Sequence, residues 1–142
     1  MKQSGFSLIE LLVTLSIIAI LAVISAPLYS QHVAKGHIKT AQADLELMSL
    51  ILENRYQRIL AYPAAQYQNT SELKAQLPQW IPSTDSSNFN FSNVNPNADT
   101  AVYTIAATGL VGLLQNCTIT FTHTRAKSIS NCANLVPDGN WL

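Results

Sequence analysis

The pattern of hydrophobic and polar positions divides the chain into an apolar first part and a mixed remainder. No Asp, Glu, Lys or Arg occurs between Glu10 and Lys35, a stretch long enough to span a membrane as a helix of about 20 residues. In residues 38–59, apolar side chains recur at spacings of three and four, which predicts an amphipathic helix packed on a sheet. Together these segments predict one helix over residues 6–62, roughly 85 Å long at 1.5 Å per residue. A small domain cannot enclose that length, so we expect the N-terminal half to protrude.

Two residues are expected to weaken this helix. Proline removes one backbone hydrogen bond and clashes with the preceding turn, so we expect a kink or local melting at Pro27. Gly36 is a second flexible position. Pro63 should end the helix, because the residue before a proline avoids the helical region.

The remainder of the chain carries loop signals and then strand signals. Residues 63–97 are rich in Pro, Gln, Asn and Ser and predict a connector, with a helical turn over 71–77 that Ser71 caps. Alternation of apolar and polar side chains then predicts short strands. These strands cover residues 88–92, 101–107, 117–124 and 126–130. A long helix followed by antiparallel strands places the chain in the α+β class.

Composition and charge set the size of the domain and narrow its partners. Hydrophobic residues make up 48% of the chain and charged residues 11%, well below the usual charged share of about 25%. The 142 residues accommodate one membrane or assembly segment and one domain of about 100 residues. The formal net charge of +0 gives no general electrostatic indication of a nucleic-acid partner.

The two cysteines, Cys117 and Cys132, lie in the C-terminal third. In an exported domain they have one possible pairing, and this disulfide closes a loop of about 15 residues and adds on the order of 3 kcal/mol of stability. Two free buried thiols in a cytosolic protein are the alternative. The apolar N-terminal segment favours export and hence the disulfide.

Two ordinary interpretations of the N-terminal segment are unsatisfactory. A cleaved signal peptide has an apolar core of about 7–15 residues and a small-residue cleavage site. The apolar run here is longer. Its best cleavage site, residues 24–26, has a bulky Ile where a small residue belongs, and Pro27 would follow the cut. A plain transmembrane anchor explains the length, although Lys2 and Lys35 on opposite sides orient it poorly. Neither explains Glu10, because a charged side chain at membrane depth costs about 2.5 kcal/mol or more.

The third interpretation starts from the residues before the apolar run. A short polar leader, Met1-Lys2-Gln3-Ser4-Gly5, precedes Phe6-Ser7-Leu8-Ile9-Glu10. This arrangement resembles the type III signal of type IV pilins and related pseudopilins. The resemblance implies cleavage between Gly5 and Phe6 by a prepilin peptidase, N-methylation of Phe6, and retention of the apolar helix.

Further positions fit the same resemblance. Glu10 matches the family's glutamate, four residues beyond the new N-terminus, and Pro27 matches a proline common in the family's N-terminal helix. Ser7 departs from the pattern, since Thr is commoner there, but both are small hydroxyl residues. The resemblance therefore assigns Glu10 to assembly and Pro27 to a helix kink.

The pairing of Glu10 has three alternatives. Cleavage creates an ammonium at Phe6, and methylation keeps its charge. In a bundle of staggered helices this ammonium can reach Glu10 of a neighbouring subunit, and pairing makes two buried charges tolerable. A pair within one chain is also open, because the two residues are four apart on a helix. The remaining alternative is a solvated Glu10 at headgroup depth; with the resemblance we favour the intermolecular or dual contact.

The resemblance also implies the type IV pilin fold. In that fold, an apolar half-helix protrudes, an amphipathic half packs on a small antiparallel sheet, and a disulfide ties the C-terminal loop, here through Cys117 and Cys132. The expected divisions are a leader at 1–5, the apolar helix at 6–35, its amphipathic half at 36–62, the connector at 63–97, and the sheet with its C-terminal loop at 98–142, so that 36–142 forms the globular head.

The implied function is that of a structural subunit. We expect a minor pilin of a bacterial type IV pilus that supports pilus assembly, twitching motility or adhesion, with other pilins and the prepilin peptidase as partners. The precursor is expected in the inner membrane, single-pass with its head in the periplasm, and the mature form in the extracellular pilus. The alternatives are a competence pseudopilin that serves DNA uptake and a type II secretion pseudopilin. The C-terminal sequence carries no calcium-ligand cluster, and this absence counts against a major pseudopilin of type II secretion.

The sequence gives no indication of an enzyme, a cofactor or a metal site. Acidic residues are scattered, and no Ser-His-Asp or Cys-His arrangement follows from the spacing. His32 and His37 are five apart, which is wrong for a metal ion shared on one helix face, and His123 ends a strand by itself. Three N-x-[ST] matches are expected by chance in a chain so rich in these residues, so no glycan is assigned.

One weak signal for DNA remains. Arg125 and Lys127 are two apart, so on a strand they share a face, and His123 joins them. Some pilins of the family that the chain resembles bind DNA. Strong polyanion binding usually needs about 6–10 phosphate contacts, so a solvated strand edge guarded by its charges is the favoured interpretation of these residues.

Overall fold

The computed structural model describes residues 7–63, 65–94, 102–132, 135–139 and 141. Gly5 and Phe6, the positions of the expected cleavage and methylation, lie outside the described residues. The chain divides into two compact units, Met1–Val33 and Ala34–Leu142.

The first unit is helical throughout its described part after Ser7. Helix α1 (Leu8–Ile59, 52 residues) begins in this unit and continues into the second. Every described side chain before Ala34 is exposed, and this stretch of α1 is long and apolar enough to cross a membrane. Hydroxyls along it donate to carbonyls of the preceding turn, as Thr14 does to Leu11 over 2.9 Å, which satisfies them without water. The unit therefore presents an apolar surface suited to lipid or to other apolar helices.

Helix α1 runs without interruption through Pro27. The expectation of local melting there is wrong, although Pro27 has no N–H to donate and leaves one backbone carbonyl without its usual helical partner. The hydroxyl of Ser30 donates to the carbonyl of Pro27 over 2.9 Å. The surrounding helical hydrogen bonds hold the backbone in place across the missing one; the kink itself stays a prediction.

The C-terminal end of α1 falls earlier than residue 62. The helix ends at Ile59 because Leu60 takes a left-handed conformation, with φ of 53°. Its N–H still donates to the carbonyl of Tyr56 over 2.7 Å, which closes the last turn. Pro63 therefore follows a turn that has already ended the helix.

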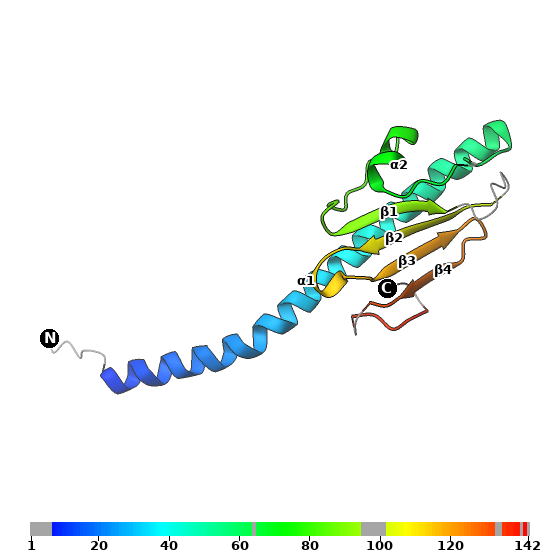
Figure 1. Cartoon of the computed structure of the whole chain (residues 1–142). Helices are drawn as coiled ribbons and strands as arrows, with labels where there is room; N and C mark the ends of the chain where they lie inside the picture. The colour runs from blue at the N-terminus through cyan, green and yellow to red at the C-terminus, as the bar shows by residue number, and fades with distance from the viewer. Residues whose placement is uncertain (1–6, 64, 95–101, 133–134, 140, 142) are drawn as a thin grey trace. The chain divides into compact units, whose positions relative to one another are not determined.

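The second unit is the head, and it combines the second half of α1 with an antiparallel sheet (Figure 1). Its remaining elements are α2 (Thr70–Gln76), β1 (Phe89–Val94), β2 (Thr104–Gly109), the 3₁₀ helix η1 (Gly112–Leu114), β3 (Thr118–Thr122) and β4 (Lys127–Ser130). The strands lie in the order β1-β2-β3-β4, each antiparallel to its neighbour. The fold class predicted from the sequence, α+β with a small antiparallel sheet, is confirmed.

Four predicted strands exist, but β2 lies further along the chain than expected. It covers Thr104–Gly109 rather than 101–107, and Phe89 of β1 pairs with Gly109. Gly109 is needed there because a Cβ would lie 1.9 Å from the carbonyl oxygen of Leu114. The close approach of η1 thus permits only glycine at the end of β2.

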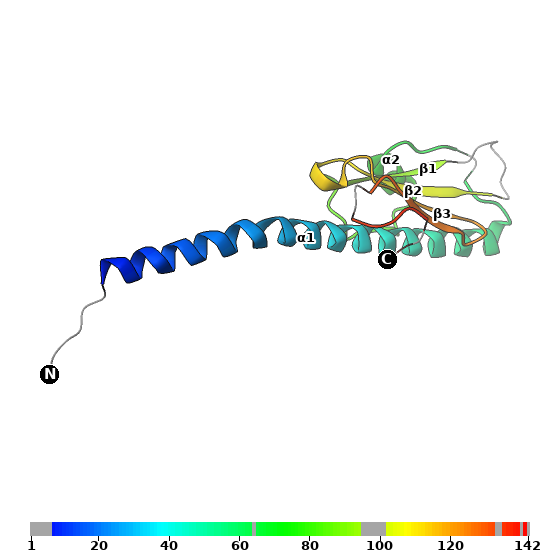
Figure 2. The same ribbon diagram turned by 90° about the horizontal axis from the view of Figure 1, so that it is seen from below.

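The core lies between α1 and one face of the sheet, along which the second half of α1 runs (Figure 2). The alternating burial along β2 and β3 sends every second side chain into this core. The largest fully buried aliphatic side chains come from both helices and the strands: Ile38, Leu45, Met48, Leu52, Leu73, Ile105, Ile119 and Ile129. Burying each such side chain stabilises the fold by about 1.5–3 kcal/mol, so the predicted amphipathic stripe of α1 forms one side of the core.

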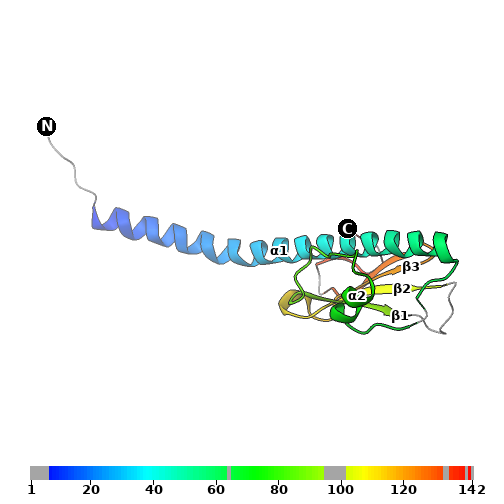
Figure 3. The same ribbon diagram turned by 90° about the horizontal axis from the view of Figure 1, so that it is seen from above.

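Helix α2 lies at the β1 edge of the sheet (Figure 3). Its N-cap is Asn69, whose side chain accepts from the N–H of Glu72 over 2.9 Å, so the expected cap at Ser71 is wrong. Both residue types cap helices well. A tertiary contact decides between them, because the amide oxygen of Asn90 accepts from the N–H of Thr70 over 3.1 Å and fixes where the helix starts.

A disulfide joins Cys117 to Cys132, with their Cα atoms 4.2 Å apart and a sequence separation of 15. This confirms the predicted pairing. The bond closes the segment that contains β3 and β4, and in the chain-entropy view a loop of this size contributes about 3 kcal/mol. The indole N–H of Trp141 donates to the carbonyl of Ser128 over 3.1 Å and holds the C-terminal segment against β4.

Candidate functional site

Glu10 lies in the first turn of α1. The carbonyl of Ser7 accepts from the N–H groups of Glu10 and Leu11 over 3.1 and 3.2 Å, so Ser7 stands at the position before the helix. A carboxylate in the first turn is favoured by the helix dipole by about 0.3–1 kcal/mol. Ser7 and Glu10 also have the S-x-x-E spacing of a capping box. This spacing is a local signal in the sequence, and it gives Glu10 a role within its own helix.

The acidic side chains of the head are engaged in internal hydrogen bonds. Asp44 is buried, and its carboxylate accepts from the N–H groups of Ser83 and Thr84, both over 2.8 Å. Glu53 accepts from the hydroxyls of Tyr62 and Tyr103 over 2.9 and 3.2 Å. Such donors offset part of the negative charge and hold each carboxylate in one orientation.

The remaining described carboxylates of the head follow the same rule. Glu72 accepts from the backbone N–H of Gln68 over 2.8 Å. Asp85 accepts from the N–H of Ser87 over 2.8 Å, and this hydrogen bond lowers the pKa of Asp85. Asp138 accepts from the N–H of Asn131 over 3.0 Å. Among the described residues of the head, every Asp and Glu has an internal partner.

The two tyrosines that bind Glu53 form a partly buried cluster with it. The ring centroids of Tyr62 and Tyr103 are 4.7 Å apart in an edge-on arrangement. Burial, followed by the hydrogen bond to Glu53, raises the pKa of Tyr62 to about 12. Burial, followed by the charge of Glu53, also raises the pKa of Tyr103. Both hydroxyls are therefore neutral donors at physiological pH, and the cluster stabilises the end of α1 against β2.

The basic side chains of the head are arranged differently from the acidic ones. Among the described basic side chains of the head, Lys127 is the one with an acidic partner. Its Nζ donates to Oε1 of Glu46, 81 residues away in sequence. It also lies 4.7 Å from the ring centroid of Trp141. No ion pair or side-chain hydrogen bond within the described chain engages the other head cations, Lys35, Lys39, Arg55, Arg58, Lys74 and Arg125. A head with equal numbers of acidic and basic residues thus presents unpaired cations and engaged carboxylates.

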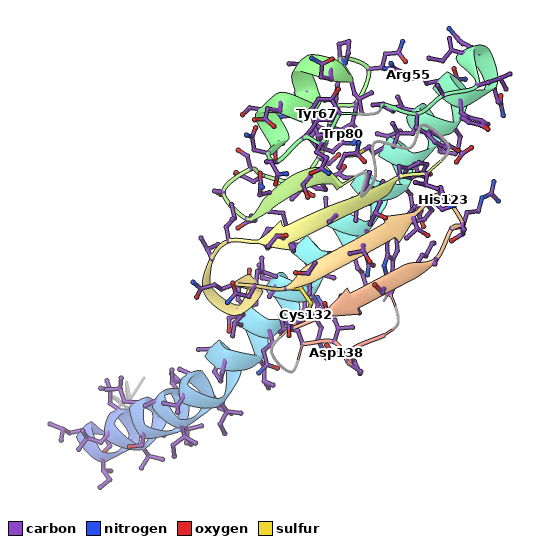
Figure 4. All side chains as sticks on the ribbon, turned by 45° about the vertical axis from the view of Figure 1, so that its right-hand side comes forward. Arg55, Tyr67, Trp80, His123, Cys132 and Asp138 are labelled. Carbon is purple, nitrogen blue, oxygen red and sulfur yellow. A yellow bond between two sulfur atoms is a disulfide. The ribbon has the colours of Figure 1, made fainter. Side chains whose placement is uncertain are left out.

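The predicted arrangement of Arg125 and Lys127 on one strand face is wrong. Arg125 lies in the turn before β4 with φ of 63°, while β4 begins at Lys127. His123 lies at the end of β3 (Figure 4), with its ring 6.3 Å from that of Tyr103. A groove of about 280 Å³ passes these cations, but Glu46 and Glu53 also line it. Its mixed charges do not favour a polyanion.

A second groove in the head is lined by cations without carboxylates. It has a volume of about 220 Å³ and lies between the last turns of α1, which carry Arg55 and Arg58, and residues 76–79, which begin at the last residue of α2. Arg55 and Trp80 are labelled in Figure 4. Sequence reasoning missed this groove because its two sides are far apart in the chain. No group of three or more His, Cys, Asp or Glu suited to a metal ion occurs in the described ranges.

A long N-terminal helix, a small antiparallel sheet and a C-terminal disulfide define the type IV pilin fold. Comparison with known families narrows the class. Residues 1–26 match the prokaryotic N-terminal methylation motif, and residues 27–135 match the family described as type IV minor pilin ComP, DNA uptake sequence receptor. The chain therefore belongs to this family of minor pilins and carries a prepilin motif.

One curated relative is similar over a short stretch. The chain is 57% identical over 37 residues to the fimbrial protein EcpB of Eikenella corrodens. These 37 residues make up 26% of this chain and 23% of the relative. The matched stretch is thus about a quarter of either protein. No solved structure matches the chain. The family match over 27–135 therefore carries the identification, and it includes most of the head.

Proposed function

We propose that this minor pilin binds DNA with its head and serves DNA uptake, the alternative role considered from the sequence. The family description names a receptor for DNA uptake sequences. The observation that carries the proposal is the charge arrangement of the head: its described carboxylates accept internal hydrogen bonds, while six of its cations lack an acidic partner within the described chain.

The number of unpaired cations fits a weak to moderate DNA site. Affinity for duplex DNA falls with salt in proportion to the number of phosphates neutralised, with a slope of about −0.9 per contact. About six contacts are the lower end of the range that gives a steep salt dependence. The formal net charge of +0 is no obstacle, because local potential rather than the sum over the chain steers a polyanion.

DNA binding is tested with the full mature chain in a neutral detergent. Fluorescence anisotropy of a labelled mixed-sequence duplex should report binding at about 50 mM salt and a loss of affinity of about 100-fold or more by about 200 mM. Competition with an uncharged polymer is the control. Absence of binding at the lower salt would refute the proposed function.

We propose in addition that Glu10 acts in assembly, through the ammonium of a neighbouring subunit's Phe6 or of its own. This proposal includes cleavage between Gly5 and Phe6, methylation of Phe6, and a precursor held in the inner membrane with its head in the periplasm. The match to the N-terminal methylation motif supports it. Intact-mass analysis of subunits from sheared pili tests it: the expected mass lacks the first five residues and carries one methyl group and the disulfide, while an unprocessed N-terminus contradicts it.

A further inference from the structure

The groove beside Arg55 and Arg58 is built on a fixed part of the head. On one side stand the last turns of α1, and on the other the residues 76–79. This second side is anchored through Trp80, which is buried and donates its indole N–H to the carbonyl of Asp44 over 3.0 Å. The N–H of Trp80 also donates to the carbonyl of Leu77 over 2.8 Å, which closes a tight turn. The groove is therefore preformed by hydrogen bonds.

The charge of this groove is positive. Arg55 and Arg58 line it, both are exposed, and neither has an ion pair or hydrogen bond within the described chain. No carboxylate lines it, and Glu53, close by in sequence, accepts from Tyr62 and Tyr103 instead. The C-terminal end of a helix carries about −0.5 charge, so two guanidinium groups outweigh it.

The remaining lining suits a nucleotide strand. Asn54, Gln76 and Gln79 supply side-chain amides, which donate and accept hydrogen bonds with sugars and base edges. Ile59 and Pro78 supply apolar surface. Guanidinium groups bind phosphate oxygens in a bidentate manner. The groove beside Glu46 combines cations with carboxylates, and these carboxylates repel a phosphate. The groove beside Arg55 and Arg58 has no carboxylate in its lining and therefore favours anions.

We propose that this arginine groove is the contact of the head with the DNA backbone: Arg55 and Arg58 bind phosphates of one strand, and Asn54, Gln76 and Gln79 contact the adjoining sugars or bases. This proposal rests on the proposed function, DNA binding by the head, and adds the place on the head where DNA binds. It assigns the main phosphate contacts to the end of α1 rather than to Arg125 and Lys127. An acidic surface of another pilin subunit is the competing occupant.

The test compares two double variants of equal charge change. Arg55→Ala with Arg58→Ala removes the groove cations, and Lys39→Ala with Arg125→Ala removes two exposed cations elsewhere in the head. Both are made in the full mature chain in neutral detergent and titrated with the same labelled mixed-sequence duplex over a range of salt. The groove variant should bind at least about tenfold more weakly and lose about 1.8 from the slope of log K against log salt, or 0.9 for each of two phosphates. The control variant should lose clearly less affinity than the groove variant, because its two cations lie outside the groove and contribute only to the general positive charge of the head.

A charge-conserving variant adds a second measurement. Arg55→Lys with Arg58→Lys should keep the salt slope but weaken binding, because lysine cannot form the bidentate contact. Circular dichroism checks that each variant is folded, which is expected because the substituted side chains are exposed.

The outcomes separate this proposal from the proposed function. If wild type binds but both double variants lose equal affinity, binding depends on overall charge and the groove is not the site. If the control loses affinity and the groove variant does not, the site lies near Arg125. If the groove variant binds DNA normally but fails to enter pili, the groove is a subunit contact. If wild type does not bind the duplex at low salt, the proposed function itself fails.

Discussion

The indole N–H of Trp80 donates a hydrogen bond to the backbone carbonyl of Asp44 over 3.0 Å and so ties the connector to the middle of α1. The carboxylate of the same residue accepts from Ser83 and Thr84. One residue of the helix thus holds three groups of a connector that is 36 or more positions away in sequence. This contact positions one side of the arginine groove.

Replacing Asp44 should destabilise the head. Asp44→Ala leaves the buried N–H of Thr84 and the half-buried N–H of Ser83 without their acceptor, and each such loss costs about 1–3 kcal/mol. We expect the free energy of unfolding to fall by about 2–4 kcal/mol in urea titrations, by the same principle. Glu46→Ala is the control, because its exposed pair with Lys127 is worth about 1 kcal/mol or less. Equal losses for the two variants would contradict this role of Asp44.

Removal of the disulfide should also destabilise the head. Cys117→Ser with Cys132→Ser opens the loop of 15 residues, and we expect a loss of about 3 kcal/mol from the greater entropy of the unfolded chain. The measurement is the urea midpoint of the oxidised wild type against the double variant. Reduced wild type should behave like the variant; a midpoint unchanged by reduction would show that native packing alone determines stability here.

Glu10 should be needed for entry into pili. Glu10→Gln keeps the size and hydrogen-bonding ability of the side chain, and with them a capping-box contact in the first turn. It removes the charge that the proposed assembly contact pairs with an ammonium. We expect pili sheared from cells to contain far less of the variant, while the membrane fraction retains it. Ser7→Ala is the matched control, since it removes the local capping hydroxyl alone. Normal incorporation of Glu10→Gln together with loss of Ser7→Ala would assign Glu10 a local role.

The tyrosine cluster predicts loss of stability at high pH. An unfolded tyrosine ionises near pH 10, whereas the pKa of Tyr62 in the fold is about 12 and that of Tyr103 is also raised. A raised folded-state pKa gives stability that is complete below pH 10 and is lost as the pH rises through 10 to 12. Urea unfolding at pH 8 and pH 11 should show this loss in wild type, and Tyr62→Phe with Tyr103→Phe should reduce it. A pH dependence equal in both proteins would locate the effect elsewhere.

Local patterns in the sequence determined the elements of this protein. Apolar spacing predicted the stripe of α1 that contains Leu45 and Leu52, and alternation predicted β3. These predictions succeed because each depends on side chains within a few positions of one another. With export assumed, the two cysteines allowed one pairing, and the structure has it.

The tertiary structure alone decided which charges are available to a partner. The sequence singled out Arg125 and Lys127 as a weak signal for DNA on one strand face, with a solvated strand edge as the favoured interpretation. In the structure Lys127 is paired with Glu46 across 81 positions, and Arg125 lies in a turn. Arg55 and Arg58 line a groove because residues 76–79 fold against the end of α1. Charge pairing depends on distance in space, and the fold brings together side chains whose separation in sequence carries no signal.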